Sequence, residues 1–360
     1  MGAGGVLLFT LAVATQAGQT GKSTENAAPN GLVVVITSKP ESQSLDLGPV
    51  SNSHMSGVDL QIHWNEIEPV EGQLNWSKVD ALFDAAQSAH RWVQLSIYPG
   101  FFTPDWALEG VKTDVFTIQY GPYMGRAQRL PMPWDALYLN HWFAFLKKVS
   151  ERYGKLPAFK MIAADGPTSV SPEFTLPNAP AEFRQWQNDG YRPSKYVGAW
   201  RQVFQFYAAE FPNQYISLSV GGGLSINEQG KIDPGEHQRT KQAVVEQGIA
   251  LVGRRFALEL DDVHAGQGAR QPNSQLEDQF VIGYNGRVIT GFQMKTSAKY
   301  ASKGMGAEGE PPLALRKSID FAMERNSAGQ HVNYLEFYAP DVLADEMQAD
   351  LEYAASLFAQ

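Results

Sequence analysis

The chain has 360 residues, of which 43% are hydrophobic and 19% charged, a composition that supports a large buried core. The net charge of -9 argues against a nucleic-acid partner, because surfaces that bind phosphates are normally basic. The chain has no cysteine, which excludes disulfides, cysteine-ligated zinc and a cysteine nucleophile. Its seven histidines are dispersed, so we expect no metal site and no cofactor.

The N-terminus carries an apolar run, VLLFTLAVA over residues 6–14, followed by small residues and a polar, glycine-rich stretch. The run has the length of a signal-peptide core and is too short to span a membrane. We therefore expect residues 1–28 to be a signal peptide and flexible spacer, and the protein to be secreted or periplasmic. No Lys or Arg precedes the run, so an apolar tail without a targeting role is the alternative.

Eight short apolar stretches predict strands. They cover residues 31–39, 57–65, 92–98, 159–164, 215–220, 256–261, 288–294 and 332–338. Amphipathic segments predict helices over about residues 75–90, 138–153, 194–211, 235–251, 312–326 and 347–358, with long loops over 99–133 and 165–193. This alternation predicts an α/β fold, a single-domain (β/α)8 TIM barrel over residues 29–360. A doubly wound open sheet is the alternative, although no strand is followed by a glycine-rich phosphate motif.

Polar side chains occupy alternate positions of several predicted strands, and the apolar positions between them should face the helices. The polar set, which includes Gln61 and Glu259, should then point into the barrel. Burying such groups costs free energy unless they pair or form a solvated site, so the barrel interior is the predicted site. Glu336, within YLEFY, is the sharpest case, and a buried ion pair with Lys295 is its alternative explanation.

Two segments carry a resemblance to a known group of enzymes. Residues 57–86 contain the pattern W-x-x-I-E-P-x-E-G-x-x-x-W, which begins at Trp64, and residues 93–107 contain Thr-Pro-Asp-Trp ending at Trp106. These segments resemble the second and third strand units of clan A glycoside hydrolases, which include β-galactosidase-type and cellulase-type barrels. We expect Glu68 and Glu71 in the first pattern to shape a turn rather than to do chemistry.

The resemblance implies two catalytic carboxylates, and this sequence departs from the family at both. In such families a Glu after the fourth strand, often preceded by Asn, is the general acid/base, and a Glu ending the seventh strand is the nucleophile. Here Glu173 is the nearest candidate after the fourth strand, beyond Asp165 at the strand tip. The seventh strand ends in Gln293, Met294 and Lys295, and Glu336 lies one strand further on.

The resemblance therefore implies a glycoside hydrolase that cleaves an O-glycosidic bond of an oligo- or polysaccharide, with Glu173 as the acid and Glu336 as the nucleophile or base. The residues expected to bind the saccharide are His63, Trp64, Tyr98, Trp106, Trp134, Asp165, Glu259, Gln293, Lys295 and Tyr334. Carbohydrate is the expected partner, with no nucleic acid and no stable membrane insertion.

Two other functions remain open. A non-catalytic carbohydrate-binding barrel would explain the missing carboxylate on the seventh strand. A secreted barrel acting on another substrate, such as a metal-dependent lyase, is opposed by the lack of a clustered His/Asp set.

Overall fold

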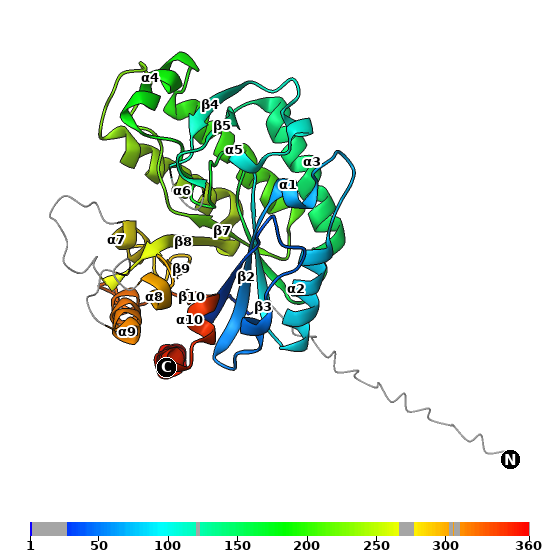
Figure 1. The fold of residues 1–360 in the computed structure, drawn as a ribbon, viewed down its shortest axis with the longest axis vertical. Coiled ribbons are helices and arrows are strands. Elements are labelled where there is room, and N and C mark those ends of the chain that lie inside the picture. The colour runs from blue at the N-terminus through cyan, green and yellow to red at the C-terminus, as the bar shows by residue number, and fades with distance from the viewer. Residues whose placement is uncertain (2–26, 120–122, 266–276, 302–304, 306–309, 360) are drawn as a thin grey trace.

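The computed structural model describes residues 1, 27–119, 123–265, 277–301, 305 and 310–359, so most of the predicted signal peptide and spacer lies outside the described residues. Eight parallel strands close into a barrel in the order β1-β10-β9-β8-β7-β6-β3-β2, with helices outside (Figure 1). The predicted (β/α)8 TIM barrel is confirmed. The open-sheet alternative is wrong, because β1 pairs with both β10 and β2.

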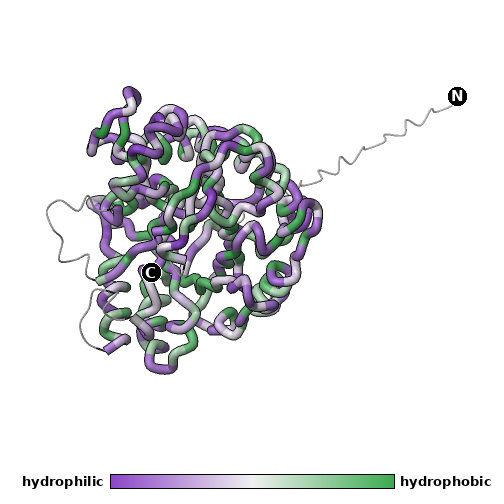
Figure 2. The backbone as a smooth tube through the Cα atoms, turned by 45° about the horizontal axis from the view of Figure 1, so that its top comes forward, coloured by the Kyte–Doolittle hydropathy of each residue, from purple (hydrophilic) through white to green (hydrophobic). Residues whose placement is uncertain are grey.

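The eight barrel strands match the predicted strands to within two residues at either end. They are β1 (Gly31–Thr37), β2 (Met55–His63), β3 (Trp92–Tyr98), β6 (Phe159–Ala163), β7 (Tyr215–Ser219), β8 (Phe256–Val263), β9 (Ile289–Met294) and β10 (Tyr334–Tyr338). Hydrophobic and hydrophilic residues alternate along much of the backbone (Figure 2). On β2, for example, Leu60 and Ile62 are buried in the main hydrophobic core, as the period of two predicts.

All six predicted helices form. They are α2 (Ser77–Ser88), α3 (Ala136–Tyr153), α5 (Pro193–Glu210), α6 (Glu236–Val252), α9 (Pro311–Ala322) and α11 (Gln348–Phe358). Asp135 begins α3 by accepting the N–H groups of Leu137 and Tyr138, and Pro193 occupies the first turn of α5, where no N–H donor is needed. Within the described residues, no helix is both long and apolar enough to cross a bilayer.

The two predicted loops contain regular structure of their own. Residues 99–133 include an antiparallel hairpin of β4 (Thr113–Thr117) and β5 (Ala127–Pro131), and residues 165–193 include α4 (Pro180–Asn188). Phe116 of the hairpin is buried and stacks on Trp186 of α4, with ring centroids 4.3 Å apart. The two insertions therefore share an aromatic contact that stabilises both. The remaining short helices are α1 (Trp64–Ile67), α7 (Glu277–Ile282), α8 (Ala298–Ala301) and α10 (Ala339–Leu343).

A separate apolar cluster closes the amino-terminal end of the barrel. It contains Val33, Met161, Ala257 and Tyr334, with Trp92, Tyr215 and Ile289 packed against it. Two glycines make room for its large rings: a Cβ at Gly57 would lie 2.5 Å from the Trp92 ring, and one at Gly291 would lie 2.1 Å from the Tyr334 ring. This aromatic floor fills the amino-terminal end of the barrel interior, so the polar interior above it faces the carboxyl-terminal end.

Replacing Gly291 with alanine should therefore destabilise the protein by about 1–3 kcal/mol, the usual cost of overpacking a core. Gly198→Ala is the matched control, because a Cβ at that position of α5 meets nothing within 4 Å. In the control, alanine should be neutral or stabilise by up to about 1 kcal/mol. Urea unfolding of both variants measures the difference, and equal stabilities would contradict the role assigned to Gly291.

Candidate active site

Above the aromatic floor, the side chains that point into the barrel are polar and bonded across strands. Ser96 donates a hydrogen bond to Asp59 (2.8 Å), and the Gln61 amide donates to Gln293 (2.7 Å). Gln293 in turn donates to the Tyr338 hydroxyl at 3.1 Å. These contacts join β2, β3, β9 and β10, so the expected inward-facing polar set is confirmed.

Four nearly inaccessible carboxyls belong to this interior. Asp59, Glu259 and Glu336 are at most 2% exposed, and Asp165, at the tip of β6, is fully buried. Burial raises the pKa of all four, and for Asp59, Asp165 and Glu336 the neighbouring carboxylates raise it further. Because like charges confined in a buried space cannot all ionise, we infer that several of these groups are protonated at neutral pH.

The expected alternative for Glu336, an ion pair with Lys295, is wrong. Lys295 is exposed and pairs with Asp262 at 3.0 Å. Glu336 Oε1 has no hydrogen-bond partner among the described residues. Lys295 belongs to the rim of the barrel, whereas Glu336 lies beneath it.

Glu173 is held beside the carboxyl end of β7. Its backbone forms a parallel bridge with Ser219, and the next residue, Phe174, donates its N–H to the Ser219 carbonyl (3.3 Å). Ser171 donates a hydrogen bond to the Glu173 carboxylate at 3.0 Å. Burial raises the pKa of Glu173 to about 7, with Ser171 opposing the shift and Glu277 adding to it. The residue is nevertheless half-buried rather than enclosed, so a ligand can reach it.

Asp261 is a site residue that the sequence analysis left out of the binding set. It ends the polar face of β8 and is half-buried. Burial raises its pKa, and Glu259 and Glu173 raise it further, while Asp261 in turn raises the pKa of Glu336. Asp261 is thus electrostatically linked to both predicted catalytic residues. The period of two that places Glu259 on the inward face also places Asp261 there, but its position at the end of the strand equally suited a loop-capping role. The same period would have extended the Gln61 face back to Asp59.

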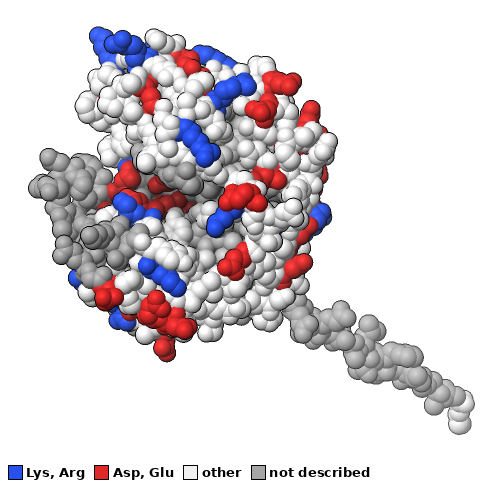
Figure 3. Space-filling model, in the orientation of Figure 1, with Lys and Arg blue, Asp and Glu red and all other residues white. Residues whose placement is uncertain are grey.

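Part of the acidic interior is open to the surface. Figure 3 shows Asp and Glu side chains gathered in a hollow of the molecule, with basic side chains at its edge. This agrees with the half-buried Glu173 and Asp261 and with the rim pair of Lys295 and Asp262. A ligand entering the barrel therefore meets a surface rich in negative charge.

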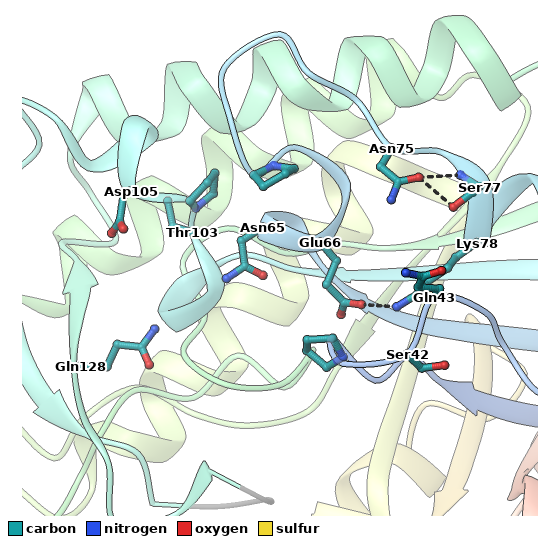
Figure 4. A pocket seen from close by; sticks show the side chains of 13 residues that line it. Ser42, Gln43, Asn65, Glu66, Asn75, Ser77, Lys78, Thr103, Asp105 and Gln128 are labelled. Atoms are coloured by element: carbon teal, nitrogen blue, oxygen red, sulfur yellow. Dashed lines mark hydrogen bonds and ion pairs between the residues drawn. The ribbon is translucent and has the colours of Figure 1, made fainter.

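His63 is fixed in orientation at the end of β2. Its ring stacks on Phe102, with centroids 3.6 Å apart, and its Nδ1 lies 3.2 Å from Glu66. Glu66 also accepts hydrogen bonds from Lys78 (2.7 Å) and Ser38 (2.6 Å). Despite partial burial, these bonds lower the pKa of Glu66 to about 2, so the carboxylate stays ionised. An open, polar pocket of about 970 Å³ adjoins this network, and Figure 4 shows the Glu66–Lys78 pair at its wall.

The three predicted stacking tryptophans pack with other aromatic side chains. Trp64 is fully buried against Trp106 and Trp142, so it has no free face for a sugar ring. Trp106 is half-buried and donates to the carbonyl of Glu68 at 3.0 Å, and Trp134 is half-buried against Trp186 and Tyr191. Trp64 is therefore a packing residue.

The other predicted binding residues divide between the interior and its floor. Tyr98 and Gln293 are buried, at 7% and 5% exposure, on the inward faces of β3 and β9. Tyr334 lies in the aromatic floor and donates a hydrogen bond to Glu259, so it supports the carboxyls from below. Glu68 accepts the N–H of Gly72 at 2.9 Å, which agrees with its expected role in a turn.

Comparisons with known proteins agree with this architecture. A glycoside hydrolase family model described as beta-galactosidase matches residues 41–211, a little under half of the 360 residues. The beta-galactosidase of the Antarctic haloarchaeon Halorubrum lacusprofundi is similar, with a TM-score of 0.54 and 11% identity over 91% of this chain and 58% of that one. The beta-galactosidase of the psychrophilic Marinomonas ef1 gives a TM-score of 0.52 and 12% identity over 91% of this chain and 59% of that one. A cellulase solved in complex with an inhibitor gives a TM-score of 0.53 and 11% identity over 91% of this chain and 92% of that one.

These matches confirm the expected resemblance to clan A glycoside hydrolase-like barrels, and at identities of 11–12% the solved structures establish the fold alone. The chain spans about three fifths of the length of the two beta-galactosidases. No curated protein sequence matches it significantly.

Removing the Glu66 charge should be strongly destabilising, because it leaves the 8%-exposed Lys78 without a counter-ion. We expect Glu66→Gln to lower the free energy of unfolding by about 3–5 kcal/mol, the usual cost of breaking a buried pair. The control is Asp262→Asn, which breaks an exposed pair and should cost no more than about 1 kcal/mol. Chemical denaturation at pH 7 measures both, and similar losses would contradict the difference between the two pairs.

The buried carboxyls should make the protein less stable as pH rises. Their native-state pKa values are raised, so the native state binds more protons than the unfolded state above about pH 4, the ordinary range of a carboxyl. Asp165→Asn removes one of these protons. The variant's free energy of unfolding should fall less steeply between pH 5 and 8, by up to about 1.4 kcal/mol per pH unit. If the free energies of unfolding of the wild type and the variant changed with pH in parallel, Asp165 would have the same pKa in the native and unfolded states. That result would contradict the prediction.

Proposed function

We propose that the chain hydrolyses an O-glycosidic bond of an oligo- or polysaccharide. The observation that carries this proposal is Glu173, a half-buried carboxyl at the open end of the barrel with a pKa of about 7. A group with that pKa exists in both protonation states near neutral pH, as an acid/base catalyst requires. The family model and the barrel fold support the same reaction class.

Glu173 is the general acid in this mechanism and protonates the oxygen of the leaving group. The second carboxylate is either Asp261 or Glu336. Asp261 is half-buried and Glu173 raises its pKa, whereas Glu336 is 2% exposed and its own pKa is raised by Asp261. We therefore assign the nucleophile or base role to Asp261, the more accessible of the two carboxyls. The pair expected from the sequence, Glu173 with Glu336, is the competing assignment.

The surrounding polar groups would hold the sugar. His63 is locked by Glu66, and Tyr98 and Gln293 offer donors on the inward faces of their strands. Gln293 occupies the seventh barrel strand, where the resemblance implies a carboxylate; its amide can bond a hydroxyl but cannot form a glycosyl ester. Lys295 lies on the rim, paired with Asp262, and the exposed part of its side chain would contact the substrate.

Gln293 also favours a second candidate function, a barrel that binds carbohydrate without cleaving it. In that case the buried carboxyls would serve recognition alone, and the protein would bind saccharides without turnover. The two functions differ in one observable, the release of sugar.

The first test is activity on a panel of aryl glycosides and plant and microbial polysaccharides. Glu173→Gln should lower kcat by about 10²–10⁴-fold, and the loss of wild-type activity above pH 7 should reflect deprotonation of this acid. Asp261→Asn should be similarly inactive if Asp261 is the partner, and Glu336→Gln would be the more damaged variant if the competing pair is correct. Glu246→Gln, which neutralises one carboxylate of an exposed ion pair with Arg287 (2.6 Å), is the control and should keep most of the activity.

Wild-type protein that binds saccharides but releases none from any substrate would establish the binding-barrel alternative instead. Full activity in a correctly folded Glu173→Gln variant would remove Glu173 from the mechanism. Circular dichroism of each variant separates loss of function from loss of fold.

We also propose that residues 1–28 direct export to a secreted or periplasmic location. Expression of the full chain followed by N-terminal sequencing of the exported product tests this. Processing near residues 17–28 is the expected result.

A further inference from the structure

Three consecutive glycines follow β7 closely and lie beside the segment that carries Glu173. We call residues 221–223 the glycine run. Gly222 donates its N–H to the Phe174 carbonyl at 3.1 Å, and Phe174 donates its own N–H to the Ser219 carbonyl at 3.3 Å. Because Glu173 immediately precedes Phe174, a displacement of the glycine run would also displace Glu173.

The glycine run is packed tightly on both sides. A Cβ at Gly221 would lie 2.9 Å from the Phe174 backbone and 2.6 Å from Thr175 Cγ2. A Cβ at Gly222 would lie 2.1 Å from Cε1 of His237, which belongs to α6. Glycine within extended backbone often marks such a close approach. The run therefore separates the Glu173 segment from α6 by little more than the thickness of a backbone.

His237 holds the glycine run from the side of α6. Its Nδ1 lies 2.8 Å from the Gly223 carbonyl, and because a carbonyl only accepts, this nitrogen carries the proton. Its Nε2 lies 3.9 Å from Glu277, which the fully buried Lys241 contacts at 2.7 Å. The His237 side chain is 32% exposed and lies outside the hydrophobic core, so it contributes little to the packing of the barrel.

Building on the proposed hydrolase function, we propose that His237 is a positioning residue for the general acid and fixes Glu173 through the glycine run. The imidazole supports Gly222, and Gly222 in turn bonds the residue that follows Glu173. The far end of the run is fixed separately, because the Tyr191 hydroxyl accepts the N–H of Leu224 at 3.0 Å. Loss of His237 should therefore loosen the run without unfolding the helix.

The first test is kinetic. His237→Ala should lower kcat about 10–100-fold, since misplacing a reacting group by about 1 Å can cost that much. KM should change by less than about 2-fold, because His237 contributes nothing to binding in the ground state. His237→Asn, which keeps a donor near the position of Nδ1, should recover kcat to within about 3-fold of wild type.

The matched control is His331→Ala. The Nδ1 of His331 also bonds a backbone carbonyl, that of Val332 at 2.6 Å, but near the amino-terminal end of β10. This variant should keep the wild-type kcat. Thermal unfolding of each variant separates misplacement of the acid from loss of fold.

A double variant tests the route through the glycine run. The three atoms nearest to a Cβ at Gly222 all belong to the His237 ring, so Gly222→Ala should displace the ring and lower kcat as His237→Ala does. In Gly222→Ala/His237→Ala the methyl group has room, and the loss should not exceed that of either single variant. Multiplied losses would mean that the two positions act independently, and would overturn the proposed route.

The position of Glu173 can also be followed without turnover. NMR of carboxyl-labelled glutamate, with Glu173→Gln to identify the signal, should give a Glu173 pKa of about 7 in the wild type. In His237→Ala the pKa should be lower by at least about one pH unit, because a loosened segment exposes the carboxyl to water. The other groups that act on Glu173 are unchanged in this variant, namely Ser171, Glu277, Asp262 and Lys295. A higher pKa would mean that His237 acts through its charge and would overturn the positioning role.

The outcomes separate this inference from the function on which it rests. A negative activity panel together with a lowered Glu173 pKa in His237→Ala would support the positioning role and overturn the hydrolase proposal alone. Unchanged kcat and pKa in that variant would overturn the positioning role and leave the hydrolase proposal intact. Reduced thermal stability with unchanged kcat would also overturn it, since His237 would then serve folding only.

Discussion

The burial of several carboxyls in one barrel without a buried cation is the constraint on which the rest of this structure depends. The floor formed by Trp92, Tyr334 and their apolar neighbours closes the barrel below these groups, and it requires glycine at positions 57 and 291. The acids above it are tolerated because protons replace counter-ions, at the cost of a pKa well above the usual range.

The same constraint explains why the candidate site lies at the open end of the barrel. Charge on a carboxylate is favourable only where solvent or a ligand can stabilise it, and here that is the rim. Glu173 and Asp261 are half-buried, whereas Glu259 and Glu336 are almost inaccessible. The interior groups therefore act through electrostatics, and the rim groups are the ones that can touch a reacting bond. Hydrogen bonds from Ser171 and across Gln61, Gln293 and Tyr338 hold this arrangement without adding positive charge.

The strands, their order of appearance and their inward faces could be predicted from the sequence, because a period of two directly reports which side chains share a face. Asp261 shares the predicted inward face of Glu259, but its place at the strand end also suited a loop cap. Asp59 lies on the face already identified at Gln61, so its omission was not forced by the sequence. Other features depend on contacts between distant segments. The partner of Lys295 is set by how β9 and β8 align, and the burial of Trp64 is set by packing against α3. The β4–β5 hairpin is stabilised by α4 through Phe116 and Trp186, which are 70 residues apart along the chain, so its short segment alone gave no clear pattern.

The departure from the related enzymes concerns where the negative charge lies in the barrel. The resemblance to clan A glycoside hydrolases implies a carboxylate on the seventh strand, and here that strand carries Gln293, which accepts from Gln61 and donates to Tyr338. The neighbouring strands β8 and β10 carry Asp261 and Glu336 instead. Because neighbouring inward positions of a barrel converge on the same space, a carboxylate can move by one strand and still face a bound sugar, provided that the vacated position becomes neutral. Gln293 meets that condition, since a carboxylate there would add to the repulsion between Asp261 and Glu336. The missing carboxylate and one of the two on the neighbouring strands are therefore explained by a single redistribution of charge within an unchanged fold, and the other neighbouring carboxylate adds to the buried acidic group.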